Sequence, residues 1–151
     1  MNFDNAYLQT EKVRFQHVDY AGIVFYPRFL EMLNSLVEDW FEDSLGLPFR
    51  EMHQTRGIPT VDLKIQFRKA ARLGEELRKY LWVKNLGTSS VLLGFRFLDA
   101  SDSLILEGEV LLVHVLISEK RNDIKSEPFP TEIRLKMERF LIPTSVSETD
   151  A

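Results

Sequence analysis

Residues 17–30 read His-Val-Asp-Tyr-Ala-Gly-Ile-Val-Phe-Tyr-Pro-Arg-Phe-Leu, and they decide the fold because they lead into the longest helix that the sequence predicts. Pro27 suits the first helical position, since its missing N–H would be unpaired there and its φ is already helical. Apolar residues then recur with a helical period at Phe29, Leu30, Leu33, Leu36, Val37, Trp40, Phe41 and Leu45. Gly46 and Pro48 follow as a natural helix end.

One acid, Asp19, lies in the polar opening of this stretch, a few residues before the predicted helix. The N-terminus of a helix presents unpaired backbone N–H groups and a partial positive charge. A carboxylate beside a set of fixed donors supplies two of the parts that acyl transfer needs. The residues alone therefore make Asp19 and the helix start a candidate site.

The remainder of the chain predicts an antiparallel sheet. Residues 60–68 alternate strictly between an apolar and a polar face, as a half-buried strand does. Further strands are predicted over 7–16, 77–86, 91–98 and 104–117, and a C-terminal helix over 130–141. Strand, long helix and then four strands predict an α+β domain whose sheet buries one face on the helix. Tyr80 and Trp82 on the outer face, and the second half of the last strand, are expected to be covered by a partner subunit.

Length and composition exclude several classes of protein. A chain of 151 residues predicts one domain over residues 1–143 with a polar tail over 144–151. The net charge of −4, with scattered basic residues, argues against a nucleic-acid partner. Without cysteine there is no disulfide, thiolate metal site or Cys nucleophile, and the three histidines form no metal-ligand pattern. No secretory leader and no apolar run of roughly 20 residues is present, so we expect a cytoplasmic protein without a membrane span.

Residues 19–29, Asp-Tyr-Ala-Gly-Ile-Val-Phe-Tyr-Pro-Arg-Phe, resemble the signature of the 4-hydroxybenzoyl-CoA thioesterase family of the hotdog superfamily. The resemblance implies the hotdog fold, an antiparallel sheet wrapped around one long central helix. It also implies homodimers with a continuous sheet, often homotetramers, and active sites at the dimer interface. The implied activity is hydrolysis of a small or aromatic acyl-CoA to free acid and CoA. No metal or bound cofactor is expected, because CoA is part of the substrate.

The resemblance assigns roles to individual residues. Asp19 matches the catalytic carboxylate, acting as nucleophile or general base, and the N–H near Tyr26 matches the donor that polarises the thioester carbonyl. Asn34 stands where the family prototype has an acid that reads a phenolic hydroxyl. Substrate contacts are also expected from Gly22, Ile23, Val24, Phe25, and from Ser89 and Ser90 in the predicted turn at residues 87–90.

Other functions stay open at this point. The acyl group could be carried by acyl carrier protein instead of CoA. A hotdog dehydratase would use a histidine paired with an acid, for which His17 near Asp19 is the only hint. A non-catalytic acyl-binding module is a third reading, against which the presence of Asp19 counts. We interpret His17 as an inward-facing structural residue, because it shares strand parity with Val13 and Phe15.

Overall fold

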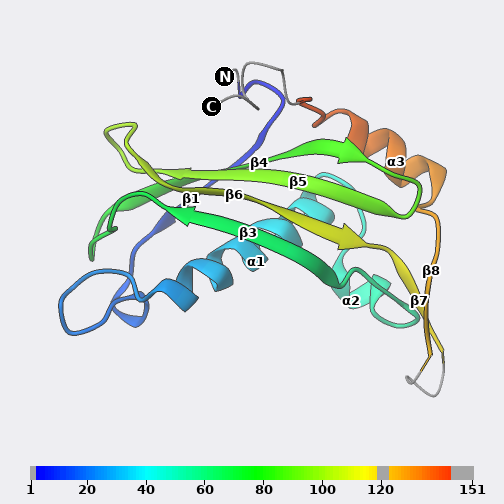
Figure 1. Ribbon diagram of the computed structural model, residues 1–151, viewed down its shortest axis with the longest axis horizontal. Helices are drawn as coiled ribbons and strands as arrows, with labels where there is room; N and C mark the ends of the chain where they lie inside the picture. Colours follow the sequence, from blue (N-terminus) through cyan, green and yellow to red (C-terminus); the bar gives the residue numbers. More distant parts are fainter. Residues whose placement is uncertain (1–2, 119–122, 144–151) are drawn as a thin grey trace.

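The computed structural model describes residues 3–118 and 123–143, and it shows an antiparallel sheet wrapped around one long helix (Figure 1). The five strands follow the order β1-β4-β5-β6-β3, and each neighbouring pair is antiparallel. Their bounds are β1 Tyr7–Lys12, β3 Thr60–Phe67, β4 Glu76–Leu86, β5 Ser90–Leu98 and β6 Leu104–Val113. The predicted α+β arrangement is confirmed, whereas the predicted tail at 144–151 lies outside the described residues.

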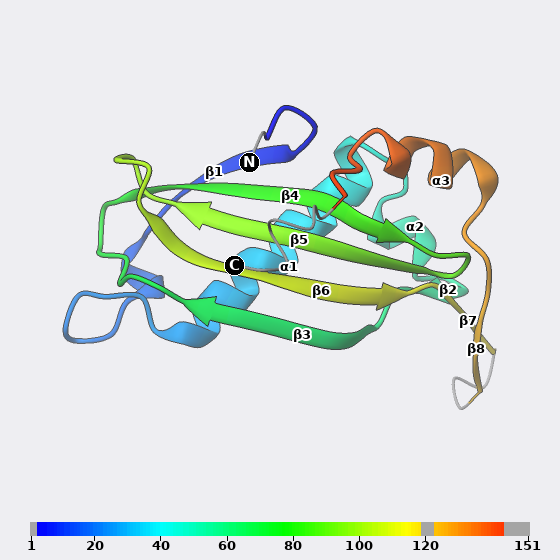
Figure 2. The ribbon, with the colours of Figure 1, turned by 45° about the horizontal axis from the view of Figure 1, so that its top comes forward.

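The long helix, α1, spans Tyr26–Asp43 and lies along one face of the sheet (Figures 1 and 2). It begins one residue earlier than predicted, so that Pro27 takes the second helical position. One face of α1 is buried through Phe29, Met32, Leu33, Leu36, Val37, Trp40 and Phe41. The side chains of β4 and β5 that face the helix are fully buried: Leu77, Leu81, Val83, Val91, Leu93, Phe95 and Phe97. The core therefore lies between α1 and the sheet.

The strand predicted over 104–117 is in fact two strands that belong to different sheets. After β6 the chain bends at His114, whose N–H donates to the Ser89 carbonyl at 2.7 Å and whose ring Nδ1 contacts the Glu127 carbonyl at 2.9 Å. These bonds hold His114 outside the ladder of the main sheet. A three-stranded sheet follows in the order β2-β7-β8, formed by β2 Arg56–Gly57, β7 Val115–Ile117 and β8 Ile124–Ser126. Two short helices complete the described chain, α2 Phe49–Met52 and α3 Thr131–Glu138.

The first strand is also shorter than predicted. It ends at Lys12, and Phe15–His17 forms one turn of 3₁₀ helix. The turn forms because the His17 Nδ1 accepts a hydrogen bond from the Arg14 N–H at 2.8 Å, which curls the backbone away from the sheet. Phe15, predicted to point inward, is consequently 83% exposed.

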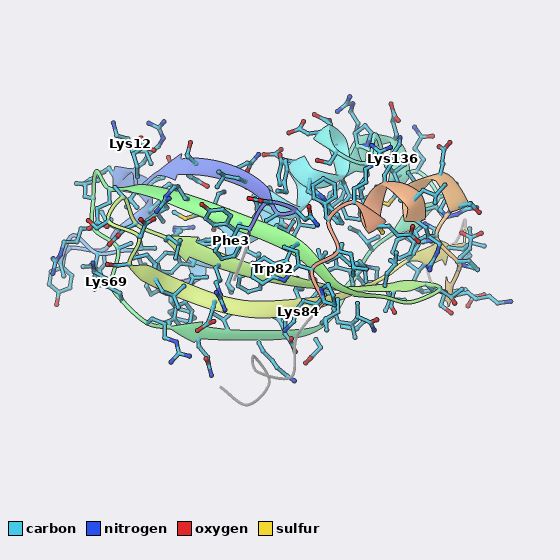
Figure 3. All side chains as sticks on the ribbon, turned by 90° about the horizontal axis from the view of Figure 1, so that it is seen from above. Phe3, Lys12, Lys69, Trp82, Lys84 and Lys136 are labelled. Carbon is cyan, nitrogen blue, oxygen red and sulfur yellow. The ribbon has the colours of Figure 1, made fainter. Side chains whose placement is uncertain are left out.

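The outer face of the sheet has a cover of its own. Phe3 stacks on Tyr80 with ring centroids 4.4 Å apart and lies 5.8 Å from the Trp82 ring (Figure 3). The Arg96 guanidinium lies 5.8 Å from the centroid of Phe3, a cation–π arrangement. Trp82 is only 5% exposed as a result. The expectation that a partner subunit must cover Tyr80 and Trp82 is therefore wrong, because the N-terminal segment of the same chain does so.

The edge formed by β3 has no such cover. Within the described residues this strand pairs only with β6, so its other side carries backbone groups that no described strand pairs with. Apolar side chains along it are exposed, with Val61 at 56%, Leu63 at 40% and Phe67 at 50%. An open edge with an apolar face is a surface that sheet proteins normally protect. No helix in the described residues is both long and apolar enough to cross a bilayer.

Candidate active site

The stretch that opened the sequence folds into a closed loop before α1. Val18 and Val24 form an antiparallel bridge across the loop. The Phe25 N–H donates to the His17 carbonyl at 3.0 Å, which ties the two ends together. A second tie joins the loop to the chain after β3, because the Val24 N–H donates to the Ala71 carbonyl at 2.9 Å. The loop is thus fixed at the N-terminal end of the helix.

Asp19 begins the tight turn at the tip of this loop. Its N–H donates to the Ile23 carbonyl at 3.0 Å, and its carbonyl accepts the Gly22 N–H at 3.0 Å. Gly22 has a φ of 77°, a conformation that most side chains would strain. One carboxylate oxygen of Asp19 accepts the Ala21 N–H at 2.9 Å. The other oxygen has no partner within the described residues and is available to a ligand.

The start of α1 offers a donor at the other end of the loop. The Tyr26 N–H donates to no acceptor in the described part of the chain, and Pro27 has no N–H. The next donor along, the Arg28 N–H, is already bonded to the Phe25 carbonyl at 2.8 Å. A free N–H at a helix N-terminus, where the helix dipole is positive, can stabilise a developing oxyanion.

Aromatic rings surround this region without being buried. Tyr20 is fully exposed, and Phe25 and Tyr26 are each more than half exposed. Phe25 packs edge-on against Tyr26 with centroids 5.7 Å apart, and Tyr26 lies 6.3 Å from Phe67 at the end of β3. Asp19 is itself exposed. Within the described residues of a single chain, Asp19 and these rings are therefore open to water. Catalysis by a carboxylate benefits from the exclusion of water, so the site would need a further cover.

A cavity of about 480 Å³ lies further along α1, between the helix, the beginning of β3 and the small sheet. Its volume is typical of a small-molecule site. Asn34 is one of the few polar groups on its wall, together with His53 and Thr60. The apolar wall comes mainly from Leu30, Leu33, Val37, Leu63, Val110, Leu112, Val115 and Ile117.

The serines predicted to contact substrate lie far from Asp19 within one chain. Ser90 opens β5 beside the beginning of β3, because Ser90 pairs with Val113, and the register of β3 on β6 ends at Thr60. The Asp19 loop lies at the other end of β3. The length of that strand separates the two regions by roughly 23 Å at about 3.3 Å per residue. Figure 1 shows the loop and the β4–β5 turn at opposite ends of the molecule.

The other predicted contacts are divided between surface and core. Ile23 is half-buried and Phe25 is exposed beside the helix start. The Val24 side chain belongs to the hydrophobic core. Among residues 3–118 and 123–143, no three His, Asp or Glu side chains gather as the ligands of a metal ion would.

Sequence reasoning missed two features of this region. The cavity is assembled from α1, α2, β3, β6 and β7, and no local pattern reports such an assembly. An ion pair at 2.6 Å joins Lys79, which is buried beneath the helix, to Glu11, which is half-buried. That pair had a signal in the sequence, because Lys79 shares the inward parity of Leu77 and Leu81.

Comparison with known proteins supports a single family. The model of the thioesterase-like superfamily matches residues 13–137. No curated protein matches the sequence.

Three solved structures share the fold at low identity. The dynemicin thioesterase has a TM-score of 0.83 and 15% identity over 91% of this chain and 98% of its own. A 1,4-dihydroxy-2-naphthoyl-CoA thioesterase from Synechocystis has a TM-score of 0.78 and 21% identity over 87% and 95%. The 4-hydroxybenzoyl CoA thioesterase from Pseudomonas has a TM-score of 0.77 and 19% identity over 87% and 98%. These likenesses confirm the predicted hotdog fold.

Proposed function

This chain belongs to the thioesterase-like superfamily, and on that basis we propose that it hydrolyses an acyl-CoA to a free acid and CoA, with Asp19 as the catalytic carboxylate. The family match bears out the class of enzyme that the sequence predicts, a thioester hydrolase. The acyl group, the carrier and the roles of single residues are our proposals.

One observation carries the proposal. The loop that holds Asp19 is closed by the hydrogen bond from the Phe25 N–H to the His17 carbonyl, and the next N–H, that of Tyr26, has no acceptor among the residues that the structure describes. A carboxylate oxygen without a partner and a free helix-terminal donor are therefore held at the same end of α1. A thioester carbonyl placed between them would have its oxygen polarised by the donor and its carbon facing the carboxylate.

Two routes of hydrolysis use this arrangement. In the first, the Asp19 carboxylate attacks the acyl carbon, CoA leaves as a thiolate that takes up a proton, and water cleaves the resulting anhydride. In the second, the carboxylate takes a proton from water, the hydroxide attacks the acyl carbon, and the proton passes to the departing sulfur. In both, the Tyr26 N–H stabilises the negative charge that develops on the carbonyl oxygen.

The open edge of β3 supports a homodimer. Antiparallel pairing of β3 with β3 of a second copy would satisfy the unpaired edge and cover Val61 and Leu63. Such pairing sets the Phe67 end of one strand against the Thr60 end of the other. The cavity of the second copy, and its Ser89 and Ser90, would then lie at the same end of the joint sheet as Asp19. We propose that the acyl group enters between the two copies, and that tetramers can form from such dimers.

The volume and polarity of the cavity support an aromatic or other compact apolar acyl group. Two solved relatives of the same fold are named as thioesterases of hydroxylated aromatic acyl-CoAs. Asn34 on the cavity wall can both donate to and accept from a ring substituent, whereas an ionised acid at that position could only accept. We further propose a cytoplasmic location and a reaction that needs no bound cofactor, with acyl carrier protein as the alternative carrier.

The test is thiol release from a panel of acyl-CoAs (benzoyl, hydroxybenzoyl, naphthoyl, short and long aliphatic). We expect Asp19→Asn to keep binding and to lose kcat by about a hundredfold or more. Asp123→Asn, which alters an exposed aspartate before β8, is the matched control and should retain full activity. Equal activity of wild type and Asp19→Asn would refute the role of Asp19. Saturable binding without turnover of any thioester would instead favour an acyl-binding module.

A further inference from the structure

We propose that the ion pair of buried Lys79 and half-buried Glu11 acts through His17 to position the Asp19 loop against α1, an inference that rests on the function proposed above. The pair takes no part in the chemistry. Its contacts lead from β1 and β4 to α1 and to His17, at the beginning of the loop.

Lys79 is the first member of the network. It projects from β4 toward the helix and is only 2% exposed. Its Nζ donates to the Glu11 Oε1 at 2.6 Å and to the backbone carbonyl of Met32 in α1 at 3.2 Å. A buried ammonium is costly unless it is paired and hydrogen-bonded, so these two contacts fix where Glu11 and α1 can lie.

Glu11 connects the lysine to the loop. Its second oxygen, Oε2, lies 3.7 Å from the Nε2 of His17, which is buried. The Nδ1 of His17 accepts the Arg14 N–H at 2.8 Å, so a neutral ring carries its proton on Nε2, facing Glu11. The imidazole is therefore held between a backbone donor on one side and the carboxylate on the other.

His17 connects the ion pair to the Asp19 loop. Its carbonyl accepts the Phe25 N–H at 3.0 Å, the bond that closes the loop. Asp19 lies two residues after His17, and Tyr26 follows Phe25 directly. Because Lys79 also holds the Met32 carbonyl, the network fixes the loop and the helix relative to one another. A misplacement of about 1 Å at a reacting group can cost as much as a hundredfold in rate.

A purely structural pair would behave differently on substitution. Replacing both members of a buried ion pair by apolar residues is often neutral for stability, because the desolvation penalty disappears with the attraction. A double variant can therefore keep the fold while it removes the carboxylate that faces His17. The positions of the loop and the stability of the domain can be measured separately in such a protein.

The experiment compares Glu11→Leu/Lys79→Met with Glu109→Leu/Lys84→Met. The control pair, Lys84 and Glu109, also joins β4 to another strand, at 2.9 Å, but it lies beside Trp82 on the outer face of the sheet. Figure 3 shows Lys84 on that face. We expect the first variant to exchange the Phe25 and Asp19 amide hydrogens at least about tenfold faster than wild type, with the amides of β5 unchanged. Its kcat should fall about tenfold or more at nearly constant KM. The control should match wild type in both measurements.

Unchanged amide exchange in residues 17–25 would overturn the inference, as would full kcat in the first variant. Glu11→Gln, which keeps the shape and one acceptor, serves if the double variant fails to fold, and it should show the same changes in smaller degree. Amide exchange needs no substrate. If wild type releases thiol from no acyl-CoA, the proposed function fails, while the exchange measurement still decides whether the network holds the loop.

Discussion

Gly108 in β6 is the position where the addition of a single methyl group should do the most damage. A Cβ at this residue would lie 2.0 Å from the Lys64 carbonyl oxygen in β3 and 2.8 Å from the Phe95 ring in β5. Carbon–oxygen contacts between strands are normally no closer than about 3.3 Å. In Gly108→Ala the backbones of β3 and β6 must therefore separate by about 1.3 Å.

The cost of that separation follows from the bonds it breaks. The two ladder hydrogen bonds that flank the clash contribute about 0.5–1.5 kcal/mol each. The overpacking against Phe95 adds about 1–3 kcal/mol. We expect the free energy of unfolding to fall by about 3 kcal/mol. With a urea m-value of about 2 kcal/mol/M, the unfolding midpoint would fall by about 1.5 M.

Urea unfolding followed by tryptophan fluorescence measures this effect. Gly57→Ala is the control, since Gly57 also lies in a strand, but the nearest atom to its added Cβ is the flexible end of the Ile117 side chain, at 3.2 Å. That variant should lose less than about 1 kcal/mol. A midpoint for Gly108→Ala within experimental error of the Gly57→Ala midpoint would refute the argument from close strand approach.

Three further predictions concern other parts of the molecule. The Lys69 ammonium, with the backbone N–H groups of Ser103 and Ser101, lowers the pKa of Asp99. Because the folded pKa lies below the unfolded value of about 3.9, the stabilisation is present above that pH and is lost as pH falls through the folded pKa. Asp99→Asn should thus lower Tm at pH 7, with the difference from wild type shrinking in acid; a pH-independent difference would contradict this. Phe3→Ala should expose Trp82, shift its fluorescence to the red and cost about 1 kcal/mol of stability, whereas an unchanged spectrum would show that Phe3 is no cover. Val61→Glu puts a charge on the open edge of β3 and should halve the mass measured by light scattering, unless the dimer forms elsewhere.

The elements that sequence predicted best are those whose determinants are local. Pro27 and the apolar stripe from Phe29 onward are enough to place α1, because apolar residues recur every three or four positions along the buried face of a helix. Apolar residues of one parity likewise indicated the inward side chains of β4 and β5, which are buried, whereas the strictly alternating β3 proves to be an exposed edge strand. The sequence also indicated Asp19 and Tyr26 as candidates, because the two lie seven residues apart, one in the loop and the other at the start of α1.

Features that depend on distant partners could not be predicted in this way. The bend at His114 depends on the carbonyls of Ser89 and Glu127, which only the fold brings near. The cover over Trp82 comes from Phe3, at the other end of the sequence. The opposite positions of Ser89 and Asp19 follow from strand register, which the resemblance alone did not supply.

The small sheet formed by β2, β7 and β8 lies at one end of the main sheet, and the Asp19 loop lies at the other (Figure 2). Val115, Ile117 and Ile124 from β7 and β8 close the far end of the cavity, yet neither strand pairs with the main sheet. Under the proposed function, the choice of acyl group and the breaking of the thioester bond would therefore fall to separate parts of the chain. Selection could then lengthen, shorten or replace the small sheet without disturbing the Asp19 loop, so that one scaffold could diversify toward many substrates at little risk to its chemistry.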